Sequence, residues 1–134
     1  MQDTTFTLEI KSDPKNVSFI EPYVNQIVEA YGVDTEMYGN ILISLTEAVN
    51  NAIIHGNDHD ESKAVRVRLR RDDKRLVFLV SDEGSGFNFN DLPDPTAPEN
   101  ILKLGGRGVF LMRQLADLVI FSDEGSTVEV QFKL

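Results

Sequence analysis

The run Leu-Val-Phe-Leu-Val at positions 76–80 constrains the fold more than any other feature of the chain. Successive side chains of a strand point to opposite faces, so a strand that is apolar throughout must be covered on both faces. Residues 65–70 alternate valine or leucine with arginine, and Asp72-Asp73-Lys74 separates the two segments. The pattern predicts a hairpin whose second strand is central in a sheet, with the arginines on the solvated face of an edge strand.

Helical periodicity appears on both sides of this hairpin. Apolar residues recur every three or four positions at 17–31, 35–53 and 109–116, and Asp34 is placed to cap the second of these helices. Further strands are predicted at 5–10, 118–121 and 127–132. Residues 88–106 contain three prolines and few apolar side chains, which predicts a long loop. We therefore expect one α/β domain over residues 1–134.

The charge of the chain narrows the choice of partners. A formal net charge of -9 argues against nucleic acid as a binding partner, because binding to a phosphate backbone depends on clustered lysine and arginine. A bound nucleotide is compatible with this negative charge, since glycine amides, a helix N-terminus and a metal ion can hold its phosphates. The chain has no cysteine, and none of its apolar runs approaches the ~20 residues of a membrane helix. We expect a cytoplasmic protein without membrane contact.

Glu47 and Asn51 are the first candidate site residues. Four positions along a helix turn a side chain by only about 40° around the axis, so both can serve one site. An amide oxygen can ligate Mg²⁺ while a carboxylate accepts a proton or holds water. Taken alone, a Glu and an Asn at this spacing more often simply face solvent on a helix surface.

The segment Asp82-Glu83-Gly84-Ser85-Gly86 directly follows the predicted central strand. A carboxylate at a strand end can accept a hydrogen bond from an adenine amino group. Glycines let the backbone approach a flat base, because they carry no Cβ. A tight Asp-x-Gly turn without any ligand is the alternative.

A second glycine cluster, Gly105-Gly106-Arg107-Gly108, opens the last predicted helix. Its backbone amides and Arg107 could hold phosphate oxygens. The cluster lacks the Lys-Ser/Thr ending of a P-loop, and no strand directly precedes it as in a dinucleotide fingerprint. A plain glycine hinge is the alternative interpretation.

Taken in chain order, four segments resemble the motifs of the GHKL ATPase and kinase superfamily. Residues 47–52 resemble its N box, 82–86 its G1 box, 106–108 its G2 box, and 125–127 the start of its terminal threonine strand. The short chain and the sequences at 51–56 and 108–112 look most like the bacterial anti-sigma-factor serine kinases. The resemblance implies a Bergerat-type two-layer α+β sandwich, in which helices cover one face of a mixed sheet and an ATP lid spans 88–104.

The resemblance also implies a role for each motif residue. Asn51 would ligate Mg²⁺, Glu47 would orient or deprotonate the attacking hydroxyl, and Asp82 would hold the adenine amino group. Further contacts would be made to the base by Gly84 and Gly86, to the phosphates by Gly106 and Gly108, to the γ-phosphate by Arg107, and on the adenine side by Thr127.

The function implied by this resemblance is ATP-dependent serine kinase and anti-sigma factor in a partner-switching circuit. Its partners would be an anti-sigma-factor antagonist, which receives the phosphate, a sigma factor, and a second copy of the chain held through the N-terminal strand and first helix. An ATP-binding switch that docks partners without phosphotransfer is the alternative. The detached catalytic domain of a histidine kinase is a third reading. The sequence does not identify the sigma factor, the antagonist or the upstream signal.

Overall fold

The computed structural model describes residues 2–72, 74–84, 107–122 and 126–134. The strands are β1 Gln2–Lys11, β2 Ala64–Asp72, β3 Arg75–Ser81, β4 Leu118–Ser122 and β5 Thr127–Lys133. The helical segments are the 3₁₀-helix η1 Pro14–Phe19, then α1 Ile20–Tyr31, α2 Thr35–Asn51, the π-helical turn η2 Ala52–Gly56, and α3 Arg107–Leu115. The expected lid at 88–104 lies outside the described residues.

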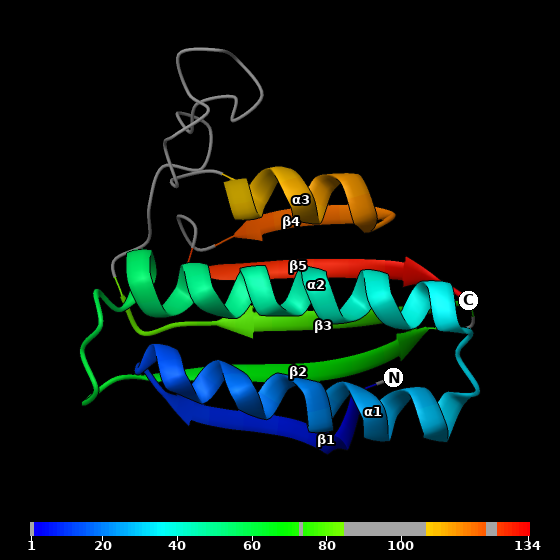
Figure 1. The fold of residues 1–134 in the computed structure, drawn as a ribbon, viewed down its shortest axis with the longest axis horizontal. Coiled ribbons are helices and arrows are strands. Elements are labelled where there is room, and N and C mark those ends of the chain that lie inside the picture. Colours follow the sequence, from blue (N-terminus) through cyan, green and yellow to red (C-terminus); the bar gives the residue numbers. More distant parts are fainter. Residues whose placement is uncertain (1, 73, 85–106, 123–125) are drawn as a thin grey trace.

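The five strands form one sheet in the order β1-β2-β3-β5-β4, and β3 is central as predicted. The expected mixed sheet is wrong for the described strands, because every neighbouring pair is antiparallel. β3 and β4 run in the same direction, and the chain crosses between them by way of α3. They are not neighbours, however, because the returning strand β5 lies between them (Figure 1).

The helices α1, α2 and α3 lie on one face of this sheet, which confirms the predicted two-layer α/β architecture (Figure 1). Alternate residues of each inner strand point to the helices and are buried, as the period-two pattern requires. They meet the apolar stripe of α2, in which Ile41, Leu45 and Val49 are fully buried. The strand residues of this core are Val65, Val67 and Leu69 of β2, Leu76, Phe78 and Val80 of β3, and Val128, Val130 and Phe132 of β5.

The predicted edge position of the arginine-rich strand is wrong, because β2 lies between β1 and β3. β1 supplies the edge instead, and its Glu9 forms an ion pair with Arg66 at 2.8 Å. Arg70 reaches over β3 to Glu129 of β5 at 3.4 Å. This cross-strand pairing helps to cover β3 on the face without described helices, where Val77 is fully buried. On this face, part of the cover of β3 therefore comes from charged side chains of the neighbouring strands.

Candidate nucleotide site

α2 and the start of α3 meet at Glu47 and Asn51. A Cβ added to Gly108 would lie 2.7 Å from Oε2 of Glu47 and 3.3 Å from Nδ2 of Asn51. A side chain at this position would have to displace the Glu47 carboxylate, so glycine lets α3 approach α2 without disturbing the pair. The structure thus brings the predicted N-box pair to one glycine of the predicted phosphate cradle.

Glu47 and Asn51 are both partly buried, which is unfavourable for polar side chains without hydrogen-bond partners. Burial raises the pKa of the Glu47 carboxyl above its ordinary value. Nδ2 of Asn51 is buried and has no hydrogen-bond partner within the described part of the chain. A raised pKa and an unsatisfied amide are expected where a protein keeps groups for a ligand rather than for its own stability.

The helix changes its geometry directly after Asn51. The π-helical turn Ala52–Gly56 continues α2, and its last residue lies against the end of β3. A Cβ on Gly56 would be 2.2 Å from Oδ2 of Asp82, and a Cβ on Gly84 would be 1.6 Å from the carbonyl oxygen of Gly56. Two glycines thus let the helix end and the turn after β3 pack backbone to backbone, which places the Asp82 carboxylate beside the helix.

Asp82 lies at the end of β3 in a fixed orientation. Its amide donates to the carbonyl of Ser126 at 2.9 Å, and its Oδ1 accepts the amide of Gly84 at 2.9 Å. Burial raises the pKa of the Asp82 carboxyl, against the smaller lowering effects of the Gly84 amide and the Lys63 charge. Oδ2 of Asp82 accepts no hydrogen bond among those described, so it can accept one from a ligand.

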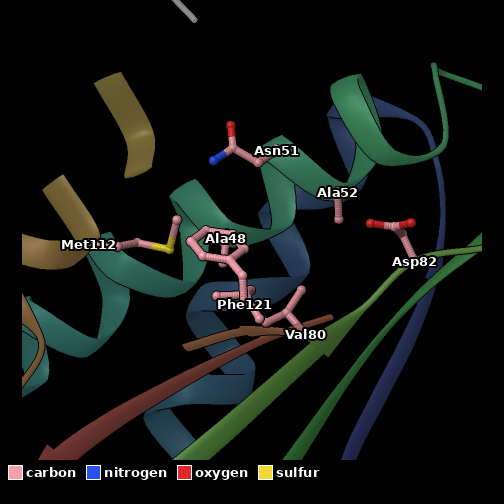
Figure 2. A pocket seen from close by; sticks show the side chains of 8 residues that line it. Ala48, Asn51, Ala52, Val80, Asp82, Met112 and Phe121 are labelled. Carbon is pink, nitrogen blue, oxygen red and sulfur yellow. The ribbon is translucent and has the colours of Figure 1, made fainter. Parts of the chain in front are cut away.

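Asn51 and Asp82 border the same hollow (Figure 2). Figure 2 shows Asn51 at the end of α2, Ala52 in the adjoining π-helical turn η2, Asp82 beyond the end of β3, and Met112 of α3 near Phe121 of β4. The other lining residues are Ala48, Val80 and Val128. The space inside it that could hold the centre of a water molecule is about 10 Å³, roughly one water and far below the roughly 300–1,000 Å³ of typical ligand sites. As formed by the described residues, this hollow is therefore too small to enclose a nucleotide.

The structure does not bring every predicted residue to this hollow. Thr127 pairs in register with Ser81 and accompanies it on the other face of the sheet, with their hydroxyl oxygens 3.4 Å apart. Val128, the next residue, faces the hollow instead. Gly86 and Gly106 lie outside the described residues, and of Arg107 only its place at the start of α3 is described.

Two neighbouring residues of the site were missed as site residues by sequence reasoning. Gly56 belonged only to the family-like segment 51–56 and was given no role in the site, although it is the residue against which Asp82 packs. Asn57 follows it and is almost fully buried, with 1% of its surface exposed. A buried asparagine beside a helix-ending glycine leaves no periodic signal, because its partners are distant in sequence.

The role of Gly56 gives a first prediction. In Gly56→Ala the new methyl group overlaps the end of the Asp82 side chain, which can turn away, so we expect ATP affinity to fall at least about tenfold while the fold survives. Gly39→Ala is the matched control, because nothing lies within 4 Å of the added Cβ and alanine favours a helix by up to about 1 kcal/mol. Calorimetric titration and thermal melting check both variants. Unchanged ATP affinity in Gly56→Ala would contradict the placement of Asp82 at the base.

A metal held by the protein alone finds no support in the described residues, among which no three His, Asp or Glu side chains gather into a possible metal site. Within the same described part, no helix is long and apolar enough to cross a bilayer.

Comparison with known proteins agrees with this geometry. Residues 10–132 match the family model described as a histidine kinase-like ATPase domain. The chain is 31% identical over 132 residues to the serine-protein kinase RsbW of Bacillus licheniformis, covering 92% of this chain and 82% of that one. The RsbW of Bacillus subtilis strain 168 is 28% identical over 128 residues, covering 90% and 80%. The RsbW of Listeria monocytogenes EGD-e is 26% identical over 129 residues, covering 91% and 82%.

Proposed function

The chain belongs to the histidine kinase-like ATPase domain family, and from this we propose that it is an ATP-dependent serine protein kinase that also acts as an anti-sigma factor in a bacterial partner-switching circuit. The observation that carries the proposal is the position of Asn51 between two groups. It borders one hollow with Asp82, which follows the end of β3, and it lies with Glu47 beside Gly108 at the start of α3. The sequence-based resemblance to the GHKL superfamily is confirmed at the level of the family.

ATP would lie with its adenine at Asp82 and its phosphates toward α3. The free Oδ2 of Asp82 would accept the adenine amino group, and Gly84 would leave room for the base. The N-terminal amides of α3 favour negative charge through the helix dipole. Gly86 would line the base with Gly84, Gly106 and Gly108 would meet the phosphates, and Arg107 would approach the γ-phosphate. Residues 88–104 would form the lid. We also propose that Thr127 supports the adenine side.

Mg²⁺ fits the residues at the α2–α3 contact. Asn51 would ligate the ion through its amide oxygen Oδ1, a hard oxygen donor, and Glu47 lies nearby at the same glycine without serving as a ligand. Because the described residues hold no wider acidic cluster, ATP phosphates would supply further ligands. When bound, the ion would neutralise phosphate charge during transfer.

Glu47 would act on the acceptor hydroxyl. Its raised pKa makes it a stronger base than an ordinary glutamate, and phosphoryl transfer otherwise needs mainly positioning and charge neutralisation. The proton of the attacking serine would pass to the Glu47 carboxylate as the hydroxyl oxygen bonds to phosphorus and the bond to the ADP oxygen breaks.

The relatives are named serine-protein kinases, which supports a serine of a protein as the acceptor. We propose that this serine belongs to an anti-sigma-factor antagonist and that the unphosphorylated antagonist competes with a sigma factor for the kinase. We also propose that residues 1–134 act as one domain in the cytoplasm, and that two copies associate through β1 and α1. A switch that binds ATP without transferring phosphate is the competing proposal.

A transfer assay separates the two proposals. Incubation with γ-labelled ATP and the cognate antagonist should label a serine of the antagonist in the presence of Mg²⁺. Antagonists of unrelated circuits serve as controls and should stay unlabelled. If the chain binds ATP but leaves the cognate antagonist unlabelled, it is a switch and the kinase proposal fails.

A further inference from the structure

Asn57 is a buried polar residue that does not line the hollow. It follows the π-helical turn and is 1% exposed. Burying an amide costs free energy unless its donors and acceptor are all used. The hydrogen-bond partners of the Asn57 side chain therefore indicate its role.

The Asn57 side chain connects three separate segments. Its Nδ2 donates to Oγ of Ser12 at 2.7 Å and to the carbonyl of Ala64 at 3.0 Å. Its Oδ1 accepts the amide of Glu83 at 2.8 Å. Since a backbone carbonyl cannot donate and a backbone amide cannot accept, these partners fix the orientation of the Asn57 amide.

The bond to Glu83 lies in the turn that carries Asp82. The amides of Asp82, Glu83 and Gly84 each donate to a different acceptor, and only the acceptor of Glu83 comes from a residue of the helix end. The Glu83 carboxylate also accepts the amide of Ala64. Asn57 thus joins the turn to the start of β2 and to the end of β1.

We propose that Asn57 is a positioning residue for base recognition, which sets the preference for adenine by holding the Asp82 turn through the Glu83 amide. The proposal rests on the proposed function, because it assumes that Asp82 meets the base. Asn57 acts without touching the nucleotide. A small rotation of the turn moves the Asp82 carboxylate, and a displaced hydrogen bond discriminates poorly between bases.

A structural role for Asn57 predicts something different. If the asparagine only stabilised the fold, its loss would weaken the binding of every nucleotide alike. The readout is therefore the ratio of dissociation constants for ITP and ATP, because ITP carries an oxygen where ATP carries the 6-amino group. This ratio reports on Asp82 and is insensitive to a general loss of folded protein.

The experiment compares wild type, Asn57→Ala and Ser12→Ala by titration with ATP and with ITP. Wild type should prefer ATP at least about tenfold, and Asn57→Ala should reduce the ratio at least about fivefold. Ser12→Ala removes a neighbouring partner of Asn57 but leaves the Glu83 bond, so its ratio should stay as in wild type. If Asn57→Ala does not fold, Asn57→Ser tests the same loss, since its shorter side chain cannot reach all three partners.

The outcomes separate the two levels of the proposal. A wild-type ratio in Asn57→Ala or Asn57→Ser overturns the positioning role while ATP binding stands. A wild type that binds ATP and ITP equally well also overturns it, because no preference exists to be set. A wild type that binds neither nucleotide removes the proposed function itself.

Discussion

Glu47→Gln is expected to reduce phosphoryl transfer to the cognate antagonist by about 10²–10⁴-fold, the usual contribution of a general base. Glutamine keeps the size and the hydrogen-bonding reach of the side chain but cannot take a proton at neutral pH. ATP affinity should change by less than about threefold, because the proposed contact of Glu47 is with the acceptor hydroxyl and not with the adenine of ATP. Single-turnover transfer of labelled phosphate measures the first quantity, and calorimetry measures the second.

Glu36→Gln is the matched control for this variant. Glu36 lies exposed in the first turn of the same helix, so its replacement changes the charge equally and should leave transfer unaffected. A transfer rate in Glu47→Gln equal to wild type would sink the proposed role of Glu47. A loss of ATP binding that parallels the loss of transfer would assign Glu47 to nucleotide binding instead.

Local sequence patterns were sufficient to predict most of the fold. The apolar run 76–80 placed β3 in the centre of the sheet, and the 3.6-residue period gave the helices that cover it. Strand direction and order are set by the path of the chain between elements, which no local pattern records. The arginines of β2 illustrate the limit, because alternation identifies an exposed face but does not tell an edge strand from an inner one.

The candidate site divides in the same way. Glu47, Asn51 and Asp82 carry recognisable chemistry at fixed spacings, and the structure brings Asn51 and Asp82 to one hollow. Gly56 and Asn57 act on the turn after β3 through residues 26 positions away, Asp82 for Gly56 and Glu83 for Asn57. Thr127 shows the converse case. Its position in the family motif predicted a contact on the adenine side. The β-strand register instead places the Thr127 side chain with Ser81, on the face of the sheet opposite the hollow.

Asn51→Ala is expected to abolish the Mg²⁺-dependent part of ATP binding without destabilising the free protein. Loss of one ligand and of the ion it holds should weaken ATP binding in Mg²⁺ at least about tenfold, or about 1.4 kcal/mol. In EDTA, wild type and variant should bind ATP almost equally. Asn50→Ala is the control, because it removes the same side chain from the neighbouring position, about 100° around the helix.

The stability of the same variant distinguishes a site residue from a structural one. Nδ2 of Asn51 is buried and lacks a partner among the described residues, so alanine removes an unsatisfied donor, not a hydrogen bond, at that atom. The melting temperature without nucleotide should therefore stay the same or rise, while the rise that Mg²⁺ and ATP produce in wild type should largely disappear. A lower melting temperature with intact Mg²⁺-dependent binding would mean that Asn51 serves the fold, and the metal would then need another ligand.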